Sequence, residues 1–145
     1  MMVKMRMLWL IYALLSAITA ALVAIFAKIG LQDVDSITAT GVRAGVMFGA
    51  IVLLMLVTGK MNTVTTLDSK SLFFIVIGGL AGASSWVFYF LALEYGKVSQ
   101  AVPIDKLSVV FAIIFAAIFL GEKLTLPTVL GVALISVGGI IIALA

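Results

Sequence analysis

Residues 8–27 read LWLIYALLSAITAALVAIFA, a stretch with no charged side chain that ends at Lys28. An α-helix rises 1.5 Å per residue, so about 20 residues cross a hydrocarbon core of about 30 Å. Four further stretches are long and apolar enough to do the same: 37–58, 71–93, 98–120 and 126–144. The sequence therefore predicts an all-α integral membrane protein, with five transmembrane helices forming one domain over residues 1–145.

The composition excludes a water-soluble domain. Apolar residues make up 65% of the chain and charged residues 10%, against roughly 45–50% and about 25% in soluble domains. The connections between the stretches are too short for a soluble domain, and without Cys or His there is no thiolate or imidazole for catalysis or metal binding. We expect no enzyme, no cofactor and no metal site. The chain has no run of Lys or Arg residues of the kind that binds nucleic acid, so we expect no nucleic-acid partner.

The N-terminus has two interpretations. Lys4 and Arg6 precede the first stretch, and small residues lie near its end, as in a secretory signal. The stretch is as long as a full span, however, and four more spans follow, which favours a retained helix.

Lys and Arg accumulate on the cytoplasmic side of membrane proteins. Five lie on the N-terminal side of this chain and two on the other, which predicts a cytoplasmic N-terminus and an external C-terminus. Adding Arg43 and Lys106, which lie nearer the second side, changes the count to five against four, and that near balance permits insertion in both orientations. The residues counted are Lys4, Arg6, Lys60, Lys70 and Lys123 on one side and Lys28 and Lys97 on the other.

Three charged residues fall inside the predicted spans, namely Arg43, Asp105 and Lys106. Each costs about 2.5–3.5 kcal/mol near a helix centre. Arg43 and Asp105 lie about 10 Å inside the same membrane surface, where Glu94 and Lys28 end their helices. We expect the three charges to line a polar cavity open to that side, with Glu94 near its mouth. Alternatively, Arg43 and Asp105 form a helix–helix tie, while Lys106 extends to the headgroups.

Pro103 predicts a helix break. A proline inside a helix removes a hydrogen bond and frees the carbonyl four residues back, here that of Ser99. In the alternative, the regular helix begins at Pro103 with Asp105 in its first turn, and Ser99 and Gln100 are irregular. Broken helices of this kind form binding sites in transporters.

Small and aromatic residues complete the candidate set. Glycines at four-residue intervals predict close helix packing, on a helix face opposite to Arg43 in the second span. Aromatic residues inside spans either face the cavity or belong to the packed core. The glycines are Gly41, Gly45 and Gly49 in the second span and Gly78 and Gly82 in the third, and the aromatic residues are Trp86, Tyr89 and Tyr12.

The last third of the chain carries a family resemblance. ALEYGKVSQA at 92–101, FLGEKLT at 119–125, and then Gly131 and Gly138-Gly139, resemble the EamA domain of the drug/metabolite transporter superfamily. The helix count and the position of Arg43 extend the resemblance over the rest. It implies an EamA-type bundle, similar to the short five-helix members of bacteria and archaea, that transports a small metabolite without ATP.

Two departures limit what the resemblance implies. The acidic–Pro pair often found before the Leu-Gly-Glu turn is replaced by Ser108-Val109, and PIDKLS at 103–108 is distinctive here. The related four-helix multidrug transporters depend on a Glu in their first helix. The first span here has no acidic residue, so their proton/drug exchange is not carried over.

These features predict a secondary transporter of a small metabolite or amphipathic solute in the cytoplasmic membrane. Alternating access generally needs two bundles, so we expect a homodimer, possibly antiparallel. Asp105 would bind a proton or a cationic group, while Arg43 or Lys106 would bind a carboxylate or phosphate. Two alternatives remain open, a translocase of lipids or lipid-linked carriers and an accessory membrane subunit.

Overall fold

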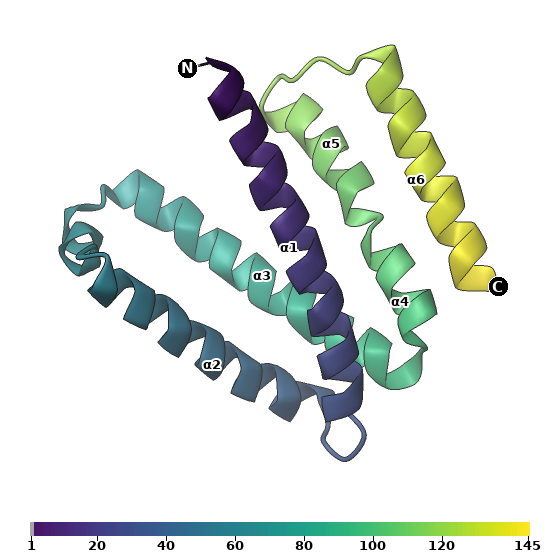
Figure 1. The fold of residues 1–145 in the computed structure, drawn as a ribbon, viewed down its shortest axis with the longest axis horizontal. Coiled ribbons are helices and arrows are strands. Elements are labelled where there is room, and N and C mark those ends of the chain that lie inside the picture. The colour runs from purple at the N-terminus through teal and green to yellow at the C-terminus, as the bar shows by residue number, and fades with distance from the viewer. Residues whose placement is uncertain (1) are drawn as a thin grey trace. The chain divides into compact units, whose positions relative to one another are not determined.

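The computed structural model describes residues 2–145, with side chains from Leu8 onward. The side chains of Lys4 and Arg6, which enter the orientation count, lie outside the described residues. The elements, in chain order, are α1 (Met2–Gly30), α2 (Ser36–Val57), the 3₁₀ helix η1 (Met61–Thr66), α3 (Ser69–Tyr95), α4 (Val98–Asp105), α5 (Ser108–Phe119) and α6 (Leu126–Leu144) (Figure 1).

The predicted all-α membrane fold is confirmed. Within residues 2–145 the elements are all helical. Five segments are long and apolar enough to cross a membrane, and their ends differ from the predicted ones by at most three residues, at Gly30 against 27. These segments are Leu8–Gly30, Ser36–Val57, Ser69–Tyr95, Val98–Phe119 and Leu126–Leu144.

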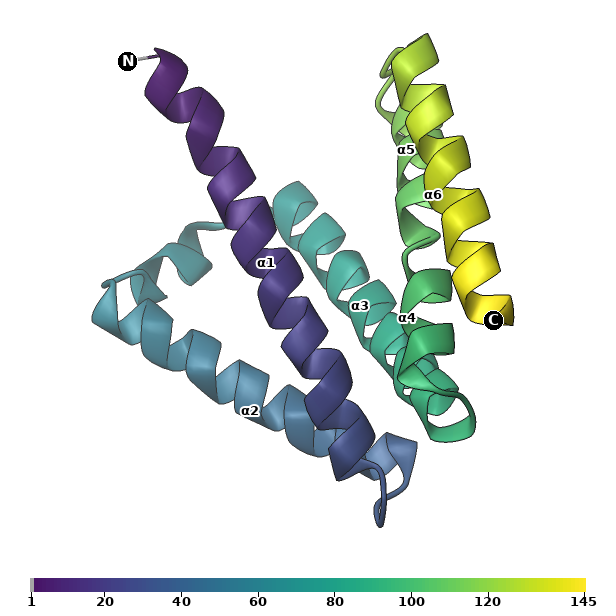
Figure 2. The same ribbon diagram turned by 45° about the vertical axis from the view of Figure 1, so that its right-hand side comes forward.

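The chain divides into two compact units. One contains α1 up to Lys28 together with Tyr95–Ala145, and the other is Ile29–Glu94, which contains α2, η1 and α3 up to Glu94. In the first unit α6 packs mainly along α4 and less along α5. The ribbon views show α6 running beside these two helices (Figures 1 and 2).

Local residues define where the helices begin and end. The side chain of Asp35 accepts hydrogen bonds from the N–H groups of Ile37 at 3.0 Å and Thr38 at 2.9 Å, which caps α2. The hydrogen bonds from Thr38 lower the pKa of Asp35 below its usual value. The cap therefore stabilises α2 fully at pH values above the usual pKa of Asp35, and this stabilisation is lost as the pH falls through the lowered pKa. Gly59 and Gly121 follow α2 and α5 with φ of 68° and 69°, which ends each helix in the left-handed conformation that glycine favours.

The fourth predicted span is two helices. Pro103 lies inside α4, and the interruption comes three residues later, at Lys106 and Leu107. There the backbone makes the tighter hydrogen bonds of a 3₁₀ turn, from Leu107 N–H to the Ile104 carbonyl at 2.9 Å and from Val109 N–H to the Lys106 carbonyl at 3.1 Å.

This differs from the alternative in which the helix begins at Pro103, because Ser99 and Gln100 are helical. The Gln100 side chain accepts a hydrogen bond from the Lys97 N–H at 3.2 Å. That bond caps the helix start, so regular structure begins at Val98.

A glycine sets the distance between α6 and α4. Gly139 is the buried residue of α6, and a Cβ added there would lie 3.1 Å from the carbonyl oxygen of Pro103. By contrast, a Cβ at any glycine predicted to mediate packing would meet nothing within 4 Å, so the packing role of those residues stays a prediction. They are Gly41, Gly45, Gly49, Gly78 and Gly82.

We predict that Gly139→Val destabilises the protein by about 1–3 kcal/mol, because the side chain would force the α4 backbone away. Gly138→Val is the matched control, since a Cβ at Gly138 meets nothing within 4 Å and the change in helix propensity is the same. Thermal unfolding of the purified protein in detergent measures both. Equal melting temperatures for the two variants would show that α6 does not approach α4 at this glycine.

Candidate functional site

An ion pair lies at the break between α4 and α5. The ammonium nitrogen of Lys106 is 3.1 Å from Oδ2 of Asp105, and the side chains are 53% and 33% exposed. Asp105 is the last residue of α4, seven residues after Val98, or about 10 Å along the span. The pair is therefore a charged, partly accessible group at a depth where the backbone is irregular. With Asp105 as its partner, Lys106 does not need to reach the headgroups to neutralise its charge.

Arg43 of α2 lies against an aromatic cluster of α3. Its Cζ is 3.3 Å from the ring centroid of Trp86 and 5.8 Å from that of Phe90. The Trp86 ring meets Tyr89 and Phe90 edge to face, with centroids 5.6 and 6.1 Å apart. A cation–π contact of this kind stabilises a cation by about 0.5–2 kcal/mol, which offsets part of the cost of about 2.5–3.5 kcal/mol for an intramembrane Arg.

Glu94, at the end of α3, binds the start of α2. Its Oε2 accepts hydrogen bonds from the Ser36 N–H at 3.2 Å and from the Ser36 hydroxyl. Ser36 is 1% exposed, and its carbonyl accepts a hydrogen bond from the Thr40 hydroxyl at 2.6 Å. A carboxylate is favoured at a helix N-terminus, where the helix dipole is positive. Glu94, predicted near a cavity mouth, thus joins two helices within its unit.

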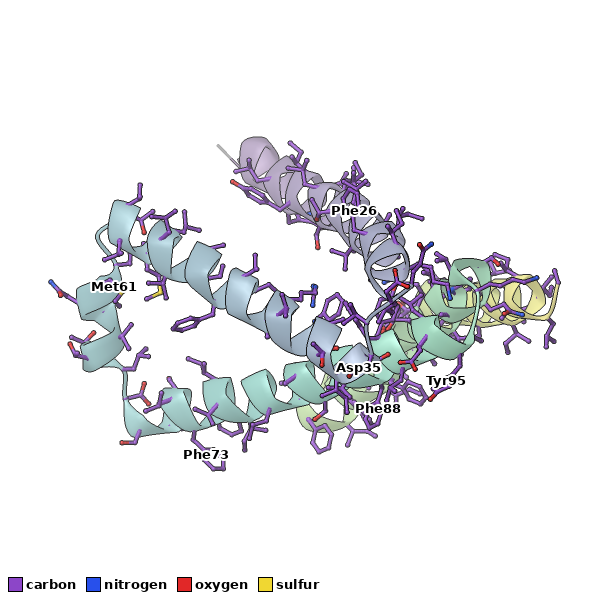
Figure 3. All side chains as sticks on the ribbon, turned by 90° about the horizontal axis from the view of Figure 1, so that it is seen from below. Phe26, Asp35, Met61, Phe73, Phe88 and Tyr95 are labelled. Atoms are coloured by element: carbon purple, nitrogen blue, oxygen red, sulfur yellow. The ribbon has the colours of Figure 1, made fainter. Side chains whose placement is uncertain are left out.

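The contacts between α2 and α3 follow each other inward from one end. Ser36 meets Glu94 first, the next turn holds the buried Thr40 and Phe90, and Arg43 then meets Trp86. Beyond this point, residues 69–81 of α3 are exposed. Figure 3 shows the same asymmetry, with the helices close together near Asp35 and apart near Met61. The polar and aromatic contacts therefore hold one end of the helix pair.

Lys28 and Tyr12 have different surroundings. The Lys28 ammonium donates a hydrogen bond to the Gly96 carbonyl at 2.9 Å, which fixes the end of α1 to the connection before α4. The side chain of Tyr12 is 67% exposed, and its part in a site stays a prediction.

The structure thus brings Arg43 together with Trp86, and Asp105 with Lys106. Sequence reasoning missed Ser36, Thr40 and Phe90. Phe90 could have been found, because it lies four residues after Trp86 and therefore on the same helix face. The contact of Ser36 with Glu94 was harder to predict, because a serine at the start of a helix is usually explained as an N-cap. Among the described residues, no cluster of three acidic side chains could hold a metal ion.

Comparison with known proteins adds the decisive observation, since residues 7–144 match the EamA-like transporter family. The chain belongs to this family. It is 41% identical over 135 residues to a Sinorhizobium protein named an uncharacterized transporter in the cobO 3' region, covering 93% of the chain and 96% of that transporter. It is 28% identical over 94 residues to an uncharacterized protein of Methanocaldococcus jannaschii, covering 65% and 69%. No solved structure matches significantly.

The resemblance found in the sequence is therefore confirmed. This EamA-like protein is a multi-pass membrane transporter.

We predict that Glu94→Leu destabilises the protein by about 1–3 kcal/mol, because it leaves the buried Ser36 donors without an acceptor. Adding Ser36→Ala to Glu94→Leu should cost much less than Ser36→Ala alone, because the hydroxyl has already lost its partner. Equilibrium unfolding in detergent of the two single variants and the double variant measures this coupling. Additive costs would mean that the Ser36 hydroxyl and the Glu94 carboxylate do not interact.

Proposed function

We propose that this EamA-like protein is a secondary transporter of a small metabolite or amphipathic solute across the cytoplasmic membrane. The observation that carries the proposal is the Asp105–Lys106 ion pair at the break between α4 and α5. Irregular backbone at membrane depth is tolerated only beside protein or water, and in transporters such breaks carry substrate and ion sites.

The ion pair suggests how transport is coupled to a gradient. Asp105 binds a proton or a cationic group, and either event ends its attraction for Lys106. The tight turn at Lys106 and Leu107 is where the span can bend, because α6 holds α4 through the contact of Gly139 with Pro103. Movement of α5 about this turn would then follow the charge state of Asp105.

Alternating access generally needs two bundles, and we propose that two copies of this chain supply them. The alignment covers 96% of the Sinorhizobium transporter, so a relative that carries the name of transporter has a similar length. The five-to-four count of cations is compatible with two copies inserted in opposite orientations.

We predict that Asp105→Asn abolishes transport driven by a proton gradient while the protein remains folded, because the amide keeps the size of the side chain but cannot bind the proton. Proteoliposomes that contain pyranine and carry an imposed pH gradient are challenged with amino acids, organic acids and amines. A solute that dissipates the gradient with the wild type should have no effect with Asp105→Asn.

Asp33→Asn is the matched control, because it makes the same change in the exposed loop before α2 and should leave transport intact. Unchanged transport by Asp105→Asn would remove Asp105 from the mechanism.

We also predict that the C-terminus reaches both sides of the membrane. Fusions to green fluorescent protein, which is fluorescent in the cytoplasm, and to alkaline phosphatase, which is active outside it, should both give signals. Thr63→Lys with Thr65→Lys in the exposed η1 raises the N-terminal count from five to seven, so only the phosphatase signal should remain. A single signal from the unaltered chain would contradict opposite orientations and require a parallel dimer or a second protein.

A further inference from the structure

We propose that Arg43, held flat against Trp86, binds an oxyanion, that is, a carboxylate or phosphate group. We infer that the solute carries this group, an inference that rests on the proposed transport function. The oxyanion site itself does not depend on transport and can be tested by binding alone.

The stacking geometry leaves the hydrogen-bond donors of Arg43 available. Cζ of Arg43 lies over the Trp86 ring, 3.3 Å from its centroid. At this distance an edge-on guanidinium would press its nitrogen atoms into the ring, so the planar group must lie nearly parallel to the indole. Its five N–H bonds lie in its own plane, so the contact fixes the orientation of the group but uses none of its donors. The indole acts as a rigid support, and the edge of the guanidinium is presented for recognition.

Within the α2–η1–α3 unit, Arg43 has no counter-ion. Within this unit its guanidinium lies over the rings of Trp86 and Phe90 and interacts electrostatically with the Tyr89 side chain, and no carboxylate of the unit is paired with it. The carboxylate of Glu94 is bound to Ser36, seven residues before Arg43 along α2. The other acidic residues of this unit lie outside the spans, where Asp35 caps α2, Asp68 accepts a hydrogen bond from the Ser71 N–H, and Asp33 is in a loop. The unit therefore holds a positive charge at membrane depth that its own residues do not neutralise.

The chemistry of the group selects the ligand. Stacking leaves the full positive charge in place, so an anion is favoured over a neutral acceptor. The fork of a guanidinium matches the paired oxygens of a carboxylate or phosphate and makes two parallel hydrogen bonds with them. A lysine would bind the same anions as a point charge, without this geometric match.

The experiment uses Trp86 itself as the reporter. The chain has two tryptophans, Trp9 and Trp86, so Trp9→Phe leaves one indole, in contact with the proposed site. The purified protein in a maltoside detergent, which has neither phosphate nor carboxylate, is titrated with acetate, inorganic phosphate and dihexanoyl phosphatidic acid. Sodium chloride at equal ionic strength gives the baseline.

We expect a saturable change in Trp86 emission with acetate or inorganic phosphate. In the Trp9→Phe background, Arg43→Lys should weaken binding by about tenfold or more, because the charge remains but the fork is lost, and Arg43→Gln should abolish the response. Lys97→Gln, which removes an exposed cation after α3, is the matched control and should leave the response unchanged. Size-exclusion profiles establish that the variants are folded.

Each other outcome decides against part of the proposal. No saturable response beyond the chloride baseline, or an unchanged response in Arg43→Gln, would overturn the oxyanion site. A response confined to dihexanoyl phosphatidic acid would assign the site to a lipid headgroup and overturn the inference about the solute. Oxyanion binding without solute-driven transport would support the Arg43 site and refute the transporter proposal. Solute-driven transport without oxyanion binding would support the transporter proposal and refute the Arg43 site.

Discussion

The hydrocarbon core offers no water to polar groups, and this constraint governs the whole protein. The five spans satisfy it for most of the backbone because their hydrogen bonds are internal to each helix. It is relaxed at the turn between α4 and α5, where hydrogen bonds to the third residue back replace the regular ladder. The Asp105–Lys106 pair lies at this turn, so irregular backbone and intramembrane charge occur together.

Polar side chains in the α2–α3 unit meet the same constraint in two ways. Ser36 and Glu94 satisfy each other directly, at the buried end of the helix pair. Arg43 instead lies over the face of Trp86, a contact that partly compensates its charge without using its N–H donors. The first arrangement is structural because both partners are satisfied. The second leaves hydrogen-bonding capacity at membrane depth, which is the property expected of a binding group.

Much of the fold could be predicted from the sequence. The spans agree within three residues because length and hydropathy alone identify a membrane helix. The motifs around 92–101 and 119–125 indicated the family that the match over residues 7–144 confirms. Arg43 and Asp105 stood out because charges inside apolar spans are rare. Their partners could not be read in the same way. Arg43 stacks on Trp86 and Asp105 pairs with its neighbour Lys106, and a tie between Arg43 and Asp105 stays a prediction.

By itself the sequence determined the number of spans, the family and the positions of the intramembrane charges, because each follows from the composition or order of residues along the chain. Tertiary structure alone decided which side chains meet. Ser36 donates hydrogen bonds to Glu94, and the Pro103 carbonyl lies close to Gly139, because helices approach closely at these residues. The break lies at Lys106 and Leu107 rather than at Pro103, which the sequence did not predict. The helix–helix contacts depend on distances between residues far apart in the chain, which no local pattern encodes.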